Sequence, residues 1–69
     1  MDKILIIDDD IQLTELLIEF LTSYKYNVTA KHTPEEGLKH LDKNEINVII
    51  LDIMLPGMDG FQVLRKIRE

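Results

Sequence analysis

Three aspartates stand where two apolar runs of this sequence end, and carboxylates in such positions can bind a metal ion. Asp8 and Asp9 follow the apolar run 4–7, and Asp52 follows the run 48–51. Carboxylates held a few ångströms apart repel one another unless a cation neutralises them, and hard oxygen ligands of this kind suit Mg²⁺ or Mn²⁺. If the two runs are neighbouring strands, the sequence predicts a divalent-cation site at their ends.

Helix capping is the alternative role for an aspartate that follows a strand. Asp10 is our candidate for the N-cap of the next helix, with Asp9 as the competitor. Since the run has three aspartates, at least one carboxylate has no capping role. Asp52 precedes the segment Ile-Met-Leu-Pro, which is not a helix start. We therefore assign a chemical role to Asp52.

Apolar runs and amphipathic segments alternate along the chain and predict the elements that position these aspartates. Runs 4–7 and 46–51 are apolar on both faces, as buried parallel strands are, whereas 27–30 alternates and suits an edge strand. Helices are expected over about 10–23, 34–43 and 60–69. The first of them carries an apolar stripe that should face the sheet, made of Leu13, Leu16, Leu17, Phe20, Leu21 and Tyr24.

The second expected helix has clear start and stop signals. Thr33 can cap it, Pro34 fits its first turn and Glu36 stands three residues after the cap. Gly37 costs this helix roughly 1 kcal/mol against alanine. We expect Asn44 to end the helix in a left-handed conformation.

The repeated order of strand and helix predicts an α/β fold with a parallel sheet. A sheet covered on both faces needs the chain to reverse its winding direction once, and the two most apolar strands should flank that reversal. The predicted strand order is therefore 2-1-3. It brings the carboxyl ends of 4–7 and 46–51 to one crevice, where ligands of open α/β sheets bind.

Composition sets further bounds on function. The 69 residues make at most one small domain, and the absence of cysteine excludes disulfides and thiolate zinc sites. The net charge of −5 argues against a nucleic-acid interface on this segment, and no apolar run is long enough for a signal peptide or a membrane span. We expect a soluble, cytoplasmic protein.

Two segments of the chain resemble the hallmark segments of response-regulator receiver domains from two-component signalling. They are Ile4-Leu5-Ile6-Ile7-Asp8-Asp9-Asp10 and Leu51-Asp52-Ile53-Met54-Leu55-Pro56-Gly57-Met58-Asp59-Gly60, joined by a matching helix, strand and helix. The resemblance implies the flavodoxin-like, receiver-type sheet and a regulatory phosphoacceptor rather than a turnover enzyme.

The resemblance also implies a role for each matching residue. Asp52 corresponds to the phosphoacceptor, Asp9 to a direct ligand of Mg²⁺, Asp8 to a carboxylate that holds the metal through water, and Met54 to a ligand through its backbone carbonyl. The phosphoryl donor would be a sensor histidine kinase. The downstream part of such a protein often carries a DNA-binding domain, so transcription regulation is the expected output.

Receivers have five strand–helix units, and this chain supplies three of them. The Ser or Thr and the Lys that the family places after its fourth and fifth strands have no counterpart here. We therefore expect an N-terminal fragment, and an interaction module that is not phosphorylated is the first alternative function.

An aspartyl-phosphate phosphatase of the haloacid dehalogenase type is a more distant alternative. Asp8 and Asp10 have the spacing of its motif, but Gln12 stands where threonine is required, and Asp52 would have no role. His32 and His40 lack ligand spacing, and we expect both to be solvated.

The last expectation concerns assembly. The run 46–51 has no following strand in this chain to pair with its outer edge, and an apolar strand edge tends to recruit another strand. We expect a homodimer in which this strand pairs with its symmetry mate, with a domain-swapped oligomer as the competitor.

Overall fold

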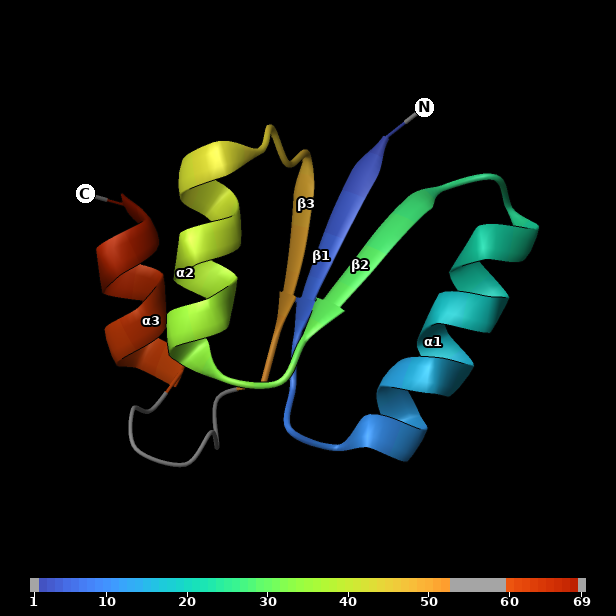
Figure 1. The fold of residues 1–69 in the computed structure, drawn as a ribbon, viewed down its shortest axis with the longest axis horizontal. Helices are drawn as coiled ribbons and strands as arrows, with labels where there is room; N and C mark the ends of the chain where they lie inside the picture. Colours follow the sequence, from blue (N-terminus) through green and yellow to red (C-terminus); the bar gives the residue numbers. More distant parts are fainter. Residues whose placement is uncertain (1, 53–59, 69) are drawn as a thin grey trace.

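The computed structural model describes residues 2–52 and 60–68 and forms three layers, with a sheet between helices. Helix α1 lies on one face of the sheet, and α2 and α3 lie on the other (Figure 1). The chain runs in the order β1 (Lys3–Ile7), α1 (Ile11–Ser23), β2 (Asn27–Lys31), α2 (Pro34–Lys43), β3 (Val48–Leu51) and α3 (Gly60–Arg68).

Strand β1 is the centre of the sheet, and its position aligns the strand ends. The three strands are parallel in the order β2-β1-β3, so the predicted order 2-1-3 is confirmed. Ile7 of β1 pairs with Lys31 of β2 and with Leu51 of β3. The three strands therefore end at the same level, and the residues that follow them emerge side by side.

The sheet face toward α2 and α3 holds the better-packed side of the molecule. Leu5 and Ile7 are fully buried there, because β1 is covered on both faces and paired on both edges. The partly buried side chains that pack against these two are Leu38, Leu41, Ile46, Ile49, Leu51 and Ile67.

Helix α2 lies close to this face because of Gly37. A Cβ atom at this position would lie 2.5 Å from Cδ1 and 2.8 Å from Cγ1 of Ile7, which is itself fully buried. Glycine costs helix stability but removes this overlap. The close approach of α2 to β1 is a packing role that the sequence pattern did not indicate.

Helix α1 covers the opposite face incompletely, and part of its apolar stripe stays exposed. Thr14 is buried and Leu17, Ile18 and Leu21 are half-buried, whereas Leu16 is 64% exposed and Phe20 59% exposed. The exposed side chains recur at helical spacing on the outward flank of the helix. No other described helix lies on this face to cover them (Figure 1).

The boundaries of β3 and α2 differ from the expected ones for local reasons. Asn47 lies just before β3, and its side-chain Oδ1 accepts a hydrogen bond from the backbone N–H of Lys3 at 2.8 Å, so β3 begins at Val48 and excludes Ile46. Asn44 is extended, with φ −138° and ψ 143°, so the prediction that it adopts a left-handed conformation is wrong. Its amide instead satisfies the helix end by donating to the carbonyl of His40 at 3.0 Å.

Candidate metal centre

Backbone hydrogen bonds carry the sheet one residue beyond the strand ends and fix the positions of two aspartates. The N–H of Asp8 donates to the carbonyl of Lys31 at 3.0 Å, and the N–H of Asp52 donates to the carbonyl of Ile7, also at 3.0 Å. Asp8 is thereby tied to β2, and Asp52 is tied to β1. These backbone hydrogen bonds therefore set the distance between Asp8 and Asp52 independently of their side chains.

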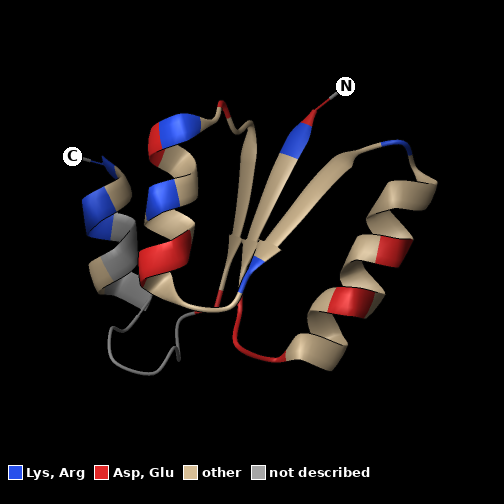
Figure 2. Cartoon of the chain, in the orientation of Figure 1, with Lys and Arg blue, Asp and Glu red and all other residues tan. Residues whose placement is uncertain are grey.

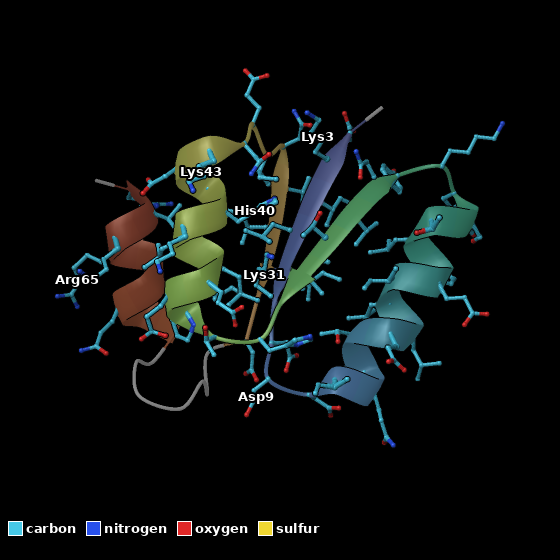
Figure 3. All side chains as sticks on the ribbon, in the orientation of Figure 1. Lys3, Asp9, Lys31, His40, Lys43 and Arg65 are labelled. Carbon is cyan, nitrogen blue, oxygen red and sulfur yellow. The ribbon has the colours of Figure 1, made fainter. Side chains whose placement is uncertain are left out.

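The carboxylates of Asp8, Asp9 and Asp52 meet at this edge. One oxygen atom of each lies within 4.8 Å of the others, and Asp8 and Asp52 are half-buried while Asp9 is exposed. Figure 3 shows Asp9 at the carboxyl end of β1, at the opposite end of that strand from Lys3. The three residues that the sequence singled out are thus brought together, and these residues stay candidates for function on that geometry.

The aspartates in the loop from β1 to α1 have different roles, and only Asp10 caps the helix. Asp10 caps α1, since its Oδ1 accepts from the N–H of Leu13 at 3.1 Å, as expected. Oδ1 of Asp8 accepts from the N–H of Asp10 at 2.9 Å, which holds the Asp8 side chain against the loop. Asp9 needs no capping role, because Asp10 fills it.

The donor set fits one small divalent cation. Oxygen ligands on opposite sides of a Mg²⁺ ion lie roughly 4.2 Å apart, twice the usual metal–oxygen distance. The span of 4.8 Å is slightly larger than that, so a small side-chain adjustment or one intervening water completes the contact. The three carboxylates also supply the negative charge that such an ion needs.

His32 is a contributor that sequence reasoning missed, because it was expected to be solvated. It is half-buried, and its Nδ1 lies 2.9 Å from the backbone carbonyl of Asp8. A ring N–H at Nδ1 is the donor in this contact, since the carbonyl can only accept. The sequence signal that could have indicated this contact is the position of His32 directly after the second strand, as Asp8 is directly after the first.

Met54 lies outside the described residues, so its expected role stays a prediction.

The comparison with protein families decides the class of this protein. The model of the response regulator receiver domain matches residues 4–69. The chain belongs to the response regulator receiver family. The phosphatase interpretation of the aspartates is therefore wrong, and the capping role of Asp10 gives the physical reason, because that interpretation needed Asp10 beside Asp8 as a second reacting carboxylate.

Curated relatives of this receiver are regulators of greater length. It is 44% identical over 68 residues to regulatory protein VanR of Enterococcus faecium, covering 99% of this chain and 29% of VanR. It is 41% identical to the transcriptional regulatory protein CpxR of Escherichia coli, covering 100% of this chain and 29% of CpxR. The chain thus spans less than a third of the curated relatives it matches.

Solved receivers have the same fold. Response regulator protein TrrA of Thermotoga maritima, solved in complex with Mg²⁺-BeF, superposes with a TM-score of 0.92 at 37% identity, covering 99% of this chain and 59% of TrrA. TrrA has also been solved in complex with histidine kinase ThkA, with a TM-score of 0.93. The flavodoxin-like, receiver-type sheet expected from the sequence is confirmed, and so is a role in regulation.

Within the described ranges 2–52 and 60–68, every helix is too short or too polar to cross a lipid bilayer.

Proposed function

We propose that Asp52 of this receiver accepts a phosphoryl group in a reaction that depends on Mg²⁺ held beside it. The observation that carries the proposal is the meeting of one oxygen each from Asp8, Asp9 and Asp52 within 4.8 Å at the ends of β1 and β3. Asp52 is the acceptor in this scheme because it ends a strand and neighbours both other carboxylates. The complex of TrrA with Mg²⁺-BeF supports the choice of cation.

The residues divide the work of the site. Asp9 is exposed and is our direct metal ligand, whereas Asp8, whose Oδ1 is held by Asp10, is our ligand through water. The backbone carbonyl of Met54 is proposed as a further ligand by family resemblance. A bound Mg²⁺ or Mn²⁺ ion would cancel the negative charge that otherwise repels an incoming phosphoryl group.

The chemical step belongs to the Asp52 carboxylate. One of its oxygens attacks phosphorus in line with the leaving group, an O–P bond forms, and the bond from phosphorus to the donor's histidine nitrogen breaks. The product is an aspartyl phosphate, and the donor histidine keeps the electron pair and recovers its proton from solvent. Asp8, Asp9 and the backbone bonds at Ile7 and Lys31 keep the acceptor oriented.

A sensor histidine kinase is the proposed phosphoryl donor, and the complex of TrrA with ThkA supports this class of partner. We place the transfer in the cytoplasm and treat the protein as a phosphoacceptor rather than a turnover enzyme. The name of CpxR supports an output in transcription, with DNA bound outside residues 1–69.

The test is incubation with acetyl phosphate and Mg²⁺, followed by borohydride trapping and mass spectrometry. We expect the label on Asp52 and its loss in Asp52→Asn or when EDTA replaces Mg²⁺. Asp42→Asn, which changes the charge equally on an exposed α2 residue, is the control and should keep the label. Label on Asp8 would contradict the assignment, and no label at all would favour the alternative of an unphosphorylated interaction module.

A second proposal concerns assembly, and the exposure of β3 carries it. We infer that the outer edge of β3 pairs antiparallel with the same strand of a second copy. β3 is an edge strand of the described sheet, and Val48 and Ile50 are 47% and 38% exposed on the face that α1 leaves open. A two-fold contact satisfies both edges at once and gives the strand order 2-1-3-3′-1′-2′.

Light scattering across a concentration series tests this assembly. We expect dimers of the original chain and monomers of Val48→Lys/Ile50→Lys, with unchanged circular dichroism in both. Leu13→Lys/Leu16→Lys on α1 is the matched control and should remain dimeric. A domain-swapped oligomer would instead persist in the strand variant, and a folded monomer at high concentration would refute the pairing.

A further inference from the structure

The α2 side of β2 is polar where a sheet face beneath a helix is usually apolar. Side chains alternate along a strand, and Asn27, Thr29 and Lys31 of β2 share the face toward α2. Asn27 and Thr29 line a hollow of about 90 Å³ beside His40 and Asn44 of the α2 end. Lys31 lines a larger neighbouring pocket of about 360 Å³ with the same two residues.

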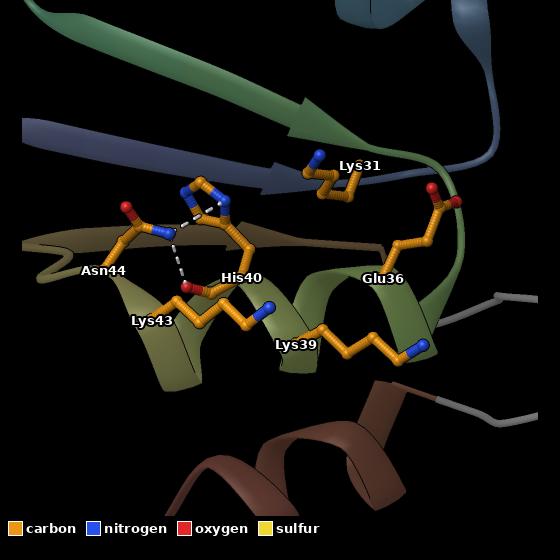
Figure 4. Close-up of a pocket in the computed structure, with 6 residues that line it drawn as sticks. All are labelled: Lys31, Glu36, Lys39, His40, Lys43 and Asn44. Carbon is orange, nitrogen blue, oxygen red and sulfur yellow. Dashed lines mark hydrogen bonds between the residues drawn. The ribbon is translucent and has the colours of Figure 1, made fainter.

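Three lysines are among the residues that line the larger pocket. Lys31 enters it from β2, and Lys39 and Lys43 enter it from α2, with Glu36 at one side as its only acidic residue among those described (Figure 4). None of these three lysines forms an ion pair with a described residue. Lys31 is half-buried, whereas Lys39 and Lys43 are exposed.

The wall of the pocket offers oriented hydrogen-bonding groups. The amide nitrogen of Asn44 donates to the carbonyl of His40 at 3.0 Å and lies 3.3 Å from its ring Nδ1. An amide NH₂ can only donate, so Nδ1 accepts in this contact, which corresponds to the tautomer with its ring proton on Nε2. His40 thus presents a donor whose direction the helix end fixes.

This concentration of positive charge contrasts with the rest of the chain. The whole sequence carries a net charge of −5, and the loop between β1 and α1 is acidic along its length (Figure 2). An extended polyanion such as nucleic acid, or an anionic membrane, would meet that negative charge as well. A small anion that enters the pocket contacts only its lining, in which Glu36 is the one acidic residue among those described, and the volume of about 360 Å³ lies in the range of small-molecule sites.

We propose that the pocket between β2 and α2 binds a small phosphorylated molecule, with its phosphate held by Lys31, Lys39 and Lys43 and its polar body by His40 and Asn44. The site is separate from the carboxylate cluster and needs no metal. It would let a soluble phosphorylated metabolite bind the receiver independently of phosphoryl transfer.

The first experiment is a titration of the ¹⁵N-labelled protein, in EDTA and at constant ionic strength, with ribose 5-phosphate. We expect saturable shifts of the amides of Lys39, His40 and Asn44, no such shifts with ribose, and weaker ones with inorganic phosphate. Equal shifts with ribose and ribose 5-phosphate, or shifts spread over all lysines without saturation, would overturn the proposal. EDTA keeps the result independent of the metal centre and of Asp52.

The second experiment uses matched charge variants. Lys39→Gln/Lys43→Gln should weaken ribose 5-phosphate binding about tenfold or more, because two charge-assisted contacts are lost. Lys25→Gln/Lys66→Gln changes the net charge equally at exposed positions outside the pocket and should leave the affinity unchanged. If both double variants weaken ribose 5-phosphate binding equally, the effect depends on net charge alone and the proposed site is refuted. Lys31→Gln gives an independent measurement if the first variant loses its circular dichroism signal.

Discussion

The two faces of the sheet differ in how far they are covered. Toward α2 and α3, Leu5 and Ile7 are fully buried within a ring of aliphatic neighbours. Toward α1, Ile50 and the outward flank of the helix, including Leu16 and Phe20, remain exposed. Amphipathic spacing predicted α1, whereas cap and proline signals predicted α2, so the comparison teaches that periodicity identifies a helix but does not say how much of its stripe is buried. That depends on how many neighbours share the face.

The largest effect should come from removing the same side chain on each face. Leu5→Ala should lower the free energy of unfolding by about 2–5 kcal/mol, because it opens a cavity at a fully buried site. Leu16→Ala should change it by less than about 0.5 kcal/mol, since Leu16 is 64% exposed. Urea denaturation followed by circular dichroism measures both, and equal losses would show that α1 is packed as tightly as the other face.

Gly37→Ala tests the closeness of α2 to the sheet. The added Cβ overlaps the buried Ile7 side chain, and overpacking of about 1–3 kcal/mol should outweigh the helix gain of about 1 kcal/mol. We expect a net loss of stability in urea denaturation.

Ile7→Val removes the Cδ1 atom nearest to the new methyl group and serves as the control. The double variant Gly37→Ala/Ile7→Val should therefore lose less than the sum of the two single losses. Additive losses would mean that the two positions do not compete for space.

Removing the N-cap of α1 or of α2 should lower the free energy of unfolding by similar amounts, smaller than the loss in Leu5→Ala. Asp10→Ala removes the acceptor for the N–H of Leu13, and Thr33→Ala removes the acceptor for the N–H of Glu36. Each should cost about 1 kcal/mol in thermal or urea unfolding. Asp10→Asn keeps an oxygen at the cap and should cost much less, and a full loss in that variant would indicate that charge rather than capping matters.

The smallest effect should appear at the carboxylate edge, where His32, directly after β2, contacts the proposed metal site. His32→Ala removes the donor to the Asp8 carbonyl and should weaken Mg²⁺ binding by roughly three- to fivefold, which is under 1 kcal/mol. Calorimetric titration measures the affinity, and His32→Asn, which keeps a donor, should restore part of it. If His32→Ala leaves the Mg²⁺ affinity unchanged, the contact between His32 and the Asp8 carbonyl has only a structural role.

The sequence was most informative where one residue type has one local task. The cap residues Asp10 and Thr33 and the strand-end position of Asp52 followed from spacing alone, and each lies as expected. The residues that sequence reasoning missed depend on partners far along the chain. His32 contacts a carbonyl 24 residues away, and Gly37 faces a strand that precedes it by a whole helix and strand. No local pattern encodes such contacts.

The central place of β1 has a consequence for the order in which the chain folds during synthesis. β1 emerges from the ribosome before β2 and β3, yet its second edge is filled only when β3 arrives. The sequence separation is 44 from Lys3 to Asn47, against 24 from Asp8 to His32 at the β2 edge. Closing the longer loop costs roughly 0.5 kcal/mol more in chain entropy, so β2 should dock before β3. Asp52 reaches Asp8 and Asp9 in that last docking step. A nascent chain therefore cannot assemble its three carboxylates before β3 has docked against β1.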